Sequence, residues 1–253
     1  MMTTTTPKPV VLITAGTAGL GAAAAYTFVK NGYRVAVNYG SNAERAAELV
    51  AELRELSGGE EYAFGIQADL GKRAEVERLV KVAVGRFGRL DVVFSNGGWT
   101  RVRGLASIEE NCHEDEWDRA FNMNVKSHLW LMRAAKEHLD AAEGAFITTA
   151  SIAGMSVNGS SLAYSVTKAA QIHLVKALAV MAAPNIRVNS VSPGLLLTEW
   201  AEQFTAEQKE AHRQKTALKR ITTVEDVAEQ VLTFAKSRST TGVNIVMDSG
   251  FTL

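Results

Sequence analysis

Tyr164 and Lys168 lie four residues apart in the stretch "AYSVTK" and pair a phenol with an ammonium. In a helix that spacing places both side chains on one face. A free tyrosine has a pKa near 10, and a neighbouring ammonium stabilises the phenolate and lowers that pKa. The pair could therefore give and take a proton near neutral pH. The ordinary alternative is a lysine whose aliphatic stem covers a half-buried tyrosine, which is common on helix surfaces.

Two further polar residues could assist such a pair. Ser151 follows the apolar run "AFITTA" (145–150), at the carboxyl end of an expected strand, where open α/β sheets bind ligands. A serine there could also be a simple turn or cap residue. Asn124 interrupts an apolar helical face in "FNMNVKSHLW". A buried amide needs hydrogen-bond partners, so we expect a polar network around Asn124.

Gly16, Gly19 and Gly21 punctuate the stretch "VVLITAGTAGLGAAAAYTFVKNG", which runs from strand through turn to helix. Glycine lets a backbone approach a pyrophosphate closely, and the helix that follows offers its positive N-terminus. Small residues also serve ordinary packing of a helix on a sheet. The position after the first strand and before the first helix favours dinucleotide binding.

The end of the second strand, "VNYGSNAER", should face the adenosine ribose of that dinucleotide. Its nearest candidates are Asn38, Tyr39, Ser41 and Asn42, all uncharged, with Arg45 one turn later. An acidic residue here would bind the 2′-hydroxyl of NAD and would repel a 2′-phosphate. Its absence predicts NADP(H) in preference to NAD(H), with hydroxyl and amide donors and the next helix N-terminus holding the phosphate.

The elements that must position these residues alternate along the chain between apolar strands and helical stretches such as "NAERAAELVAELREL". Such alternation predicts βαβ units and an α/β fold of Rossmann type, a doubly wound, seven-stranded parallel sheet with helices on both faces. We expect a disordered lead over 1–9, one domain over 10–253, and a substrate lid near 195–218 that reads as amphipathic helix. The expected strands are 10–14, 34–39, 62–67, 91–95, 145–150, 186–192 and 243–247.

Composition narrows the function further. The 253 residues hold 27 Lys and Arg against 27 Asp and Glu, so nothing indicates a nucleic-acid or membrane partner. No apolar run approaches the roughly 20 residues that span a bilayer. The single cysteine, Cys112, permits no disulfide within the chain, and we interpret it as an ordinary thiol. We expect a soluble, cytoplasmic protein with no metal site.

These motifs, in this order, resemble the short-chain dehydrogenase/reductase family, of the single-domain kind, over residues 10 to 250. Three positions depart from the family pattern: Ala15 stands where the first turn glycine is usual, and Ser95 and Gly97 replace the commoner Asn and Ala. We expect them to tune cofactor affinity. The stretches "VNYGSN" and "SNGGW" are similar to NADPH-dependent reductases of fungal polyketide and naphthol pathways. The matching motifs are "TAGTAGLG", Asp69 in "ADL", "SNGG" (95–98), Asn124, Ser151, "YSVTK", "PGLLLT" and "TGVNIVMDSG".

The resemblance implies a role for each member of a catalytic tetrad. Tyr164 would donate the proton in carbonyl reduction, Lys168 would lower the tyrosine pKa and reach the nicotinamide ribose, Ser151 would bind the substrate oxygen, and Asn124 would hold a water. Asp69 would bond the adenine, and Leu196 and Thr198 the carboxamide. The full cofactor set is Gly16, Thr17, Gly19, Leu20, Gly21, Asn38, Tyr39, Ser41, Asn42, Asp69, Leu70, Asn96, Gly97, Gly98, Tyr164, Lys168, Pro193, Gly194, Leu196 and Thr198.

The expected function is NADPH-dependent reduction of a ketone with an apolar or aromatic body. The alternatives are an NAD-dependent secondary-alcohol dehydrogenase and a non-catalytic dinucleotide-binding sensor or scaffold of the same fold. Long apolar helices around 114–140 and 162–183 must be buried somewhere, and the family pairs them in tetramers. We expect a homotetramer, with a dimer as the alternative. Residues expected to line the substrate pocket, or else to fill core or interface, are Trp99, Met155, Val157, Leu195, Trp200 and Phe204.

Overall fold

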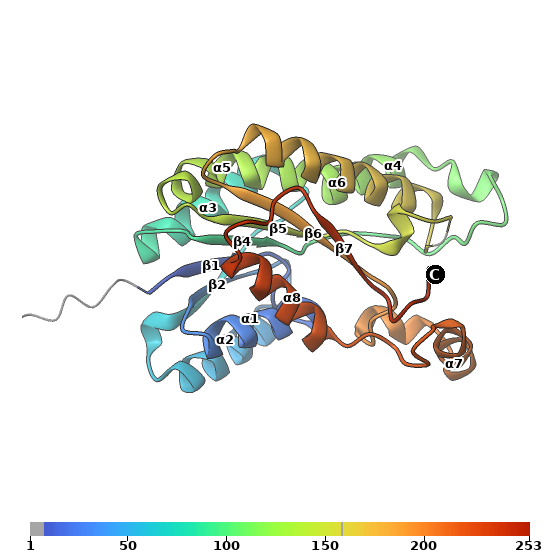
Figure 1. The fold of residues 1–253 in the computed structure, drawn as a ribbon, viewed down its shortest axis with the longest axis horizontal. Coiled ribbons are helices and arrows are strands. Elements are labelled where there is room, and N and C mark those ends of the chain that lie inside the picture. The colour runs from blue at the N-terminus through green and yellow to red at the C-terminus, as the bar shows by residue number, and fades with distance from the viewer. Residues whose placement is uncertain (1–7, 158) are drawn as a thin grey trace, which may run out of the picture.

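A computed structural model of the chain describes residues 8–157 and 159–253. Its centre is one sheet of seven strands, all parallel, in the order β3-β2-β1-β4-β5-β6-β7 (Figure 1). This confirms the predicted α/β class, and each predicted strand lies within one residue of an observed one. The strands are β1 (Val10–Ile13), β2 (Arg34–Tyr39), β3 (Ala63–Gln67), β4 (Val92–Ser95), β5 (Ala145–Thr149), β6 (Arg187–Pro193) and β7 (Asn244–Met247).

Helices cover both faces of the sheet (Figure 1). Helices α1, α2 and α8 pack on one face, and α3, α5 and α6 on the other. A π-helical segment, η3 (Asn122–Lys126), joins α4 to α5. The α-helices are α1 (Gly19–Lys30), α2 (Ala43–Ser57), α3 (Arg73–Phe87), α4 (Glu114–Phe121), α5 (Ser127–Ala141), α6 (Leu162–Met181), α7 (Ala206–Lys215) and α8 (Val224–Lys236). The 3-10 segments are η1 (Glu60–Tyr62), η2 (Glu109–Asn111), η4 (Ile152–Gly154) and η5 (Glu199–Gln203).

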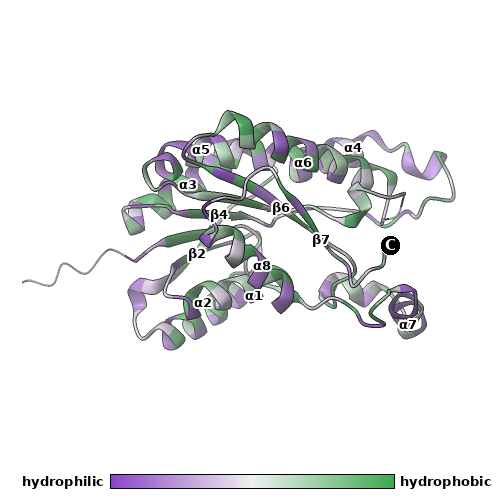
Figure 2. Ribbon diagram, in the orientation of Figure 1, coloured by the Kyte–Doolittle hydropathy of each residue, from purple (hydrophilic) through white to green (hydrophobic). Residues whose placement is uncertain are grey.

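The inner strands of the sheet are buried on both faces, which explains the apolar runs in their sequences. Along β1, Val11 and Ile13 enter the core beneath α1, α2 and α8, while Val10 and Leu12 enter the core beneath α3, α5 and α6. Figure 2 shows hydrophobic strands between helices that carry both hydrophilic and hydrophobic residues. In the described part of the chain no helix is long and apolar enough to cross a membrane.

The strand order reverses between β1 and β4, because the chain builds outward from β1 in both directions. Open parallel sheets bind ligands at such a point, outside the carboxyl ends of the strands. The glycine turn follows β1, and Ser151 follows β5 at the same edge. The topology therefore gathers the predicted site residues at one end of the sheet.

Two predictions about the chain's outer segments need adjustment. The first seven residues of the predicted disordered lead (1–9) lie outside the described residues, but the Pro9 carbonyl accepts a hydrogen bond from the Arg34 N–H at 2.8 Å. The predicted lid is not one helix. It divides into η5 and α7, because Thr205 caps α7 with a capping box made with Gln208 and so starts a new helix. Figure 1 shows α7 close to the C-terminus.

Candidate active site

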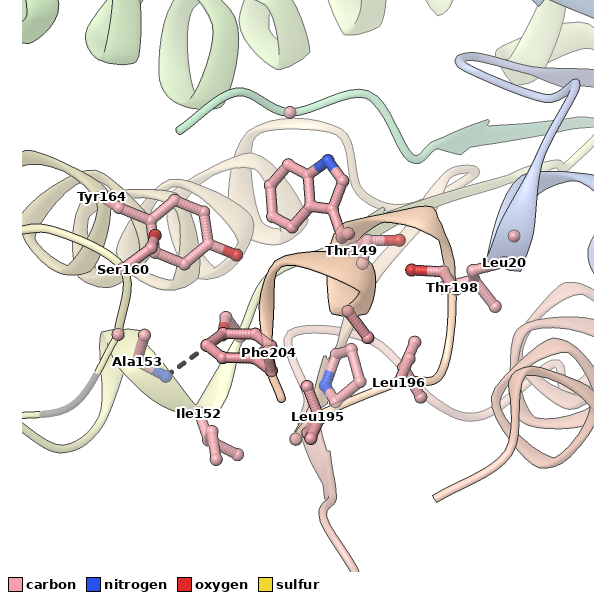
Figure 3. A pocket seen from close by; sticks show the side chains of 18 of the residues that line it. Leu20, Thr149, Ile152, Ala153, Ser160, Tyr164, Leu195, Leu196, Thr198 and Phe204 are labelled. Carbon is pink, nitrogen blue, oxygen red and sulfur yellow. Dashed lines mark hydrogen bonds between the residues drawn. The ribbon is translucent and has the colours of Figure 1, made fainter. Parts of the chain in front are cut away.

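Helix α6 carries Tyr164 and Lys168 on its inward face, as their spacing predicts. The hydroxyl of Ser161 caps the helix by accepting a hydrogen bond from the Tyr164 N–H at 3.2 Å. This cap fixes the first turn, and with it the position from which the tyrosine side chain leaves the helix. Tyr164 is half-buried, and Lys168 is only 3% exposed. In Figure 3 the phenol points into the pocket.

Ser151 lies just past β5, where the backbone is extended, and faces Tyr164. Its hydroxyl accepts a hydrogen bond from the Ala153 N–H at 3.1 Å, drawn as the dashed line in Figure 3. Burial raises the pKa of Tyr164 to about 12, and a hydrogen bond with Ser151 opposes this rise. The phenol is therefore protonated throughout the neutral range.

The predicted effect of Lys168 on the pKa of Tyr164 stays a prediction, and the hydrogen bonds of Lys168 lead away from the phenol. Its Nζ donates to the Thr149 carbonyl at 2.7 Å and to Gln171 Oε1 at 3.0 Å. The ammonium lies 5.5 Å from the centre of the tyrosine ring. Burial lowers the pKa of Lys168 to about 7. Desolvation therefore acts on the two groups in opposite directions, because burial disfavours both the phenolate and the ammonium.

Asn124 is fully buried in the π-helical segment between α4 and α5. Its Oδ1 accepts from the Trp99 N–H at 2.7 Å, and its Nδ2 donates to the Trp99 carbonyl at 2.9 Å and to Thr167 Oγ1 at 3.0 Å. The expected polar network around Asn124 is confirmed. A Cβ built on Gly98 would lie 3.4 Å from Asn124 Oδ1 and 3.6 Å from Lys168 Nζ, so glycine leaves the space between them open.

The glycine turn offers an anion site at the start of α1. No side chain in the described part of the chain caps this helix at Ala18, and Ala18, Gly19 and Leu20 all line the pocket. Gly19 has a φ of +49°, which glycine adopts without strain, and a Cβ on it would lie 2.8 Å from Thr198 Cγ2. Ala15 also has a positive φ, +47°. The conformation that the family usually gives to a glycine is thus kept by an alanine.

Gly16 and Gly21 serve packing within the same turn. A Cβ on Gly16 would lie 2.7 Å from Val37 Cγ1, and one on Gly21 would overlap the Ala15 carbonyl. Both residues let the helix begin close to the sheet, as the close packing of a dinucleotide turn requires.

Asn38, predicted to hold a 2′-phosphate, instead supports the glycine turn. It is 1% exposed, its Oδ1 accepts from the Ala15 N–H at 3.1 Å, and its Nδ2 donates to three backbone carbonyls. No donor remains for a ligand. The other predicted residues at this strand end, Tyr39, Ser41 and Asn42, are at least partly exposed. Asn42 Oδ1 caps α2, and Arg45 pairs with Glu199 of η5 at 2.6 Å.

The segment after β4 joins three strand ends. Asn96 donates through its backbone to Thr14 Oγ1 at 2.9 Å, and its Oδ1 accepts from Thr149 Oγ1 at the same distance. Leu70 occupies the space beside Gly97, where a Cβ would overlap Leu70 Cδ1. The departure at Gly97 thus has a local cause. Asp69, which the resemblance places at the adenine, accepts a hydrogen bond from the Gly71 N–H through Oδ1 at 2.9 Å.

Part of this set lines a cavity of about 840 Å³, whereas Asn38, Asp69, Leu70, Gly97 and Asn124 are not among its lining residues. Leu195, Trp200 and Phe204 line it as predicted, and Figure 3 shows Phe204 and Leu195 beside Ile152. Trp99, Met155 and Val157 are not among the lining residues. Val157 is 88% exposed, and the ring of Trp99 lies under the Arg119 guanidinium. Other lining residues are Ala15, Leu20, Asn96, Gly98, Thr149, Ser151, Ser160, Tyr164, Lys168, Pro193, Gly194, Leu196 and Thr198.

Several pocket residues escaped prediction. From the lid and the C-terminal segment, His212 and Phe251 stack with ring centres 4.3 Å apart, and both line the cavity. Gln171 and the Thr149 carbonyl hold the lysine. A glutamine seven residues after Tyr164, on the apolar stripe of α6, was the one available signal, because a buried amide is uncommon without a partner.

Comparison with known proteins decides the family. Residues 14–252 match the family model described as "Enoyl-(Acyl carrier protein) reductase". The chain is 35% identical to the "Granaticin polyketide synthase putative ketoacyl reductase 2" of Streptomyces violaceoruber, over 98% of each chain. It is 31% identical to a short-chain dehydrogenase from Burkholderia cenocepacia J2315 solved with NADP, with a TM-score of 0.88 over 98% of each chain.

The chain belongs to the short-chain dehydrogenase/reductase family. A second solved member is a 7 alpha-hydroxysteroid dehydrogenase complexed with NADH and 7-oxo glycochenodeoxycholic acid. It is 27% identical, with a TM-score of 0.87, and the match covers 96% of this chain and 93% of that one. Family membership makes the protein an oxidoreductase, and the relatives solved with NADP and NADH support a nicotinamide dinucleotide as cofactor. The residues fit such a group, because the uncapped start of α1 opens into the cavity that also holds Tyr164.

Proposed function

We propose that this short-chain dehydrogenase/reductase is an NADPH-dependent carbonyl reductase in which Tyr164 is the general acid. One observation carries the proposal: Tyr164, Ser151 and Lys168 line the same cavity as the glycine turn. A ketone in that cavity would lie between a protonated phenol and an anion-binding helix start. The relation to a ketoacyl reductase supports the same reaction.

A bound nicotinamide supplies the hydride. Ser151 and Tyr164 would donate hydrogen bonds to the carbonyl oxygen, which stabilises negative charge as it develops there. Tyr164 would then transfer its proton to that oxygen, and the Lys168 ammonium would stabilise the phenolate that remains. Burial raises the pKa of Tyr164 to about 12, so the phenol holds its proton at neutral pH, as a proton donor in reduction must. An NAD-dependent alcohol dehydrogenase would need the phenolate in the resting enzyme.

The proposal is tested with Tyr164→Phe, which removes the acid and keeps the ring against Trp200, 6.0 Å away between ring centres. We expect the rate at which the enzyme reduces a panel of ketones to fall by about 100-fold or more, with NADPH binding retained. Tyr62→Phe, in η1 just before β3, is the matched control and should keep wild-type rates. Wild-type turnover by Tyr164→Phe would exclude Tyr164 as the acid. Cofactor binding without turnover by the wild type would favour a non-catalytic protein.

The preference for NADPH is supported by the residues that follow β2. The exposed candidates there, Ser41 and Asn42, are neutral, and Arg45 is the cation nearest to them along the chain. A guanidinium binds a phosphate with paired hydrogen bonds, which a neutral 2′-hydroxyl cannot match. A lower Kd for NADPH than for NADH, measured by fluorescence titration, is the expected result.

The pocket supports a substrate with an apolar body. Leu195, Trp200 and Phe204 form an apolar wall beside the catalytic groups. Burying apolar area contributes about 25 cal/mol per Å², so larger aliphatic or aryl ketones should have higher kcat/KM than acetone-sized ones. Trp200→Ala should reduce that gain for aryl ketones, and equal kcat/KM across the series would contradict an apolar site.

We also propose that copies of this chain associate, as a homotetramer or a dimer. The outer sides of α5 and α6 expose Leu129, Leu162 and Val166, each at least 36% accessible. Apolar residues repeated along helix faces favour burial against another surface. Light scattering should give a mass of two or four chains, and a stable monomer would contradict the proposal.

A further inference from the structure

A set of buried polar residues lies behind Lys168 and has no part in the proton transfer. Gln171 is 0% exposed, His128 is 1% exposed and Ser95 is 2% exposed. Burying an amide or an imidazole costs free energy unless hydrogen bonds replace those to water. Their position beside the catalytic ammonium raises the question of what they do for it.

Gln171 holds the lysine through a closed triangle of hydrogen bonds. Lys168 Nζ donates to Gln171 Oε1 at 3.0 Å and to the Thr149 carbonyl at 2.7 Å. Gln171 Nε2 donates to the same carbonyl at 3.1 Å. This last bond fixes the amide orientation, because the Nε2 side must face the carbonyl and Oε1 must face the ammonium.

Two of the three lysine N–H donors are thereby directed. The third is free to turn toward the space beside Gly98, between Lys168 Nζ and Asn124 Oδ1. Thr149 lies at the end of β5, and Gln171 is one turn after Lys168 on α6. The lysine is thus anchored to both the sheet and its own helix.

The titratable groups that face Lys168 give it no counter-charge. They are Tyr164, whose pKa is raised, and His128 on α5, whose pKa is lowered to about 3 by burial and by the charge of Lys168. His128 Nδ1 lies 2.5 Å from Ser95 Oγ, and its Nε2 has no hydrogen-bond partner among the described residues. Protonation of His128 would place N–H groups on both ring nitrogens, and the one on Nε2 would be buried without an acceptor. This favours the neutral imidazole. Among the described residues the hydrogen-bond acceptors of Nζ are neutral oxygens, from Gln171 and Thr149.

We propose that Gln171 is a positioning residue for the catalytic lysine: its Oε1 directs Nζ and maintains the charged form that the reaction uses. The proposal rests on the proposed role of Lys168. It assigns to a side chain outside the tetrad the task of keeping the ammonium charged where burial opposes the charge. Both acceptors are uncharged, so replacing Gln171 should change the lysine's proton affinity in a direction set by the new side chain.

The test uses Gln171→Leu and Gln171→Glu in the full-length protein, with the pH dependence of kcat measured at saturating NADPH. Leu removes an acceptor from a charged donor, so loss of activity at alkaline pH should move to lower pH by about one unit. Glu adds an opposite charge, so the same loss should move to higher pH by about one unit or more. A merely structural glutamine would not give shifts of opposite sign.

Gln171→Met tests the packing effect separately, because it fills a similar volume and should shift the profile in the same direction as Leu. If Gln171→Glu does not fold, the Met and Leu variants still test the inference: the alkaline loss of kcat should lie at lower pH in both variants than in the wild type. Gln230→Leu and Gln230→Glu, on α8 beneath the other face of the sheet, are the matched controls and should leave the profile unchanged.

Wild-type profiles in the Gln171 variants, or shifts in one direction for both Leu and Glu, would overturn the inference. If the Gln171 variants give either of these results and Tyr164→Phe is inactive, the proposed role of Gln171 is wrong and the proposed function still holds. If Tyr164→Phe retains full activity, the proposed function itself fails.

Discussion

The ion pair between Arg45 and Glu199 provides the sharpest test of cofactor choice. It joins the start of α2, where a 2′-phosphate would bind, to η5 of the lid, with Nη1 and Oε1 2.6 Å apart. The two side chains are 36% and 61% exposed. An exposed pair of this kind contributes about 0 to 1 kcal/mol, so a phosphate can compete for the arginine. Bound NADPH is then expected to take Arg45 from Glu199, whereas NADH is not.

The magnitude follows from that competition. In Glu199→Gln the arginine is released without cost, and NADPH should bind up to about 5-fold more tightly, since 1.4 kcal/mol corresponds to a factor of ten. In Arg45→Met the charge-assisted hydrogen bonds are lost, and NADPH should bind about 10- to 100-fold more weakly. NADH affinity should be unchanged in both variants. Arg54→Met, at the other end of α2, is the matched control.

Fluorescence titration with both cofactors, at low and high salt, measures these effects. The NADPH preference should diminish as salt rises, because the contacts are exposed and screened. Hydrogen exchange across residues 199–215 gives an independent readout, since NADPH should release η5 from α2. Equal changes for NADPH and NADH in Arg45→Met would show that the guanidinium does not read the 2′-phosphate. Unchanged NADPH affinity in Glu199→Gln would refute the competition.

Three further predictions concern stability. Gly97→Ala should lower the free energy of unfolding by about 1 to 3 kcal/mol, because its Cβ would overlap Leu70. In urea melts, adding Leu70→Val should recover part of this loss. If the effects of the two substitutions are additive, the contact between these residues is not the cause. Burial lowers the pKa of His128 to about 3 in the folded protein, below its unfolded value, so the unfolded chain binds the proton at higher pH. The free energy of unfolding should therefore fall as pH drops below about 6.5, by up to about 1.4 kcal/mol per pH unit. That slope should be smaller in His128→Gln, and an identical slope would assign it to other groups. Ala15→Gly should change stability by no more than about 1 kcal/mol, because relief of the positive φ offsets added freedom in the unfolded chain; a large loss in thermal melts would contradict this balance.

The strands and the catalytic face of α6 could be predicted because each depends on local pattern. Buried parallel strands are apolar on both sides, and four-residue spacing fixes a helix face whatever surrounds it. The pocket wall could not be predicted as well. Leu195 and Phe204 line the cavity, but Met155 is 55% exposed and gives its sulfur to a hydrogen bond from Asn244. Whether a loop side chain turns inward depends on contacts with distant segments, and no local pattern records them.

The pKa of Tyr164 shows a similar limit. Sequence proximity to Lys168 predicts an attraction that would lower it. The outcome depends on burial of both groups and on where the ammonium directs its hydrogen bonds, and these are set by Thr149 and Gln171. Desolvation raises the tyrosine pKa and lowers the lysine pKa, so it prevails over the charge.

Asn38 shows why the same residue type can be a ligand or a support. Its position at the end of β2 is where a ribose contact is expected, and its amide has the right donors. In the structure every donor of that amide is used on the backbone of β2, β3 and the residue after β3, and its oxygen holds Ala15 in place. Asn38 therefore acts on the cofactor site through the shape of the glycine turn. In the proposed NADPH complex, selection of the 2′-phosphate would fall to the exposed residues that follow, so changes at Arg45 and its partner Glu199 are expected to separate NADPH from NADH.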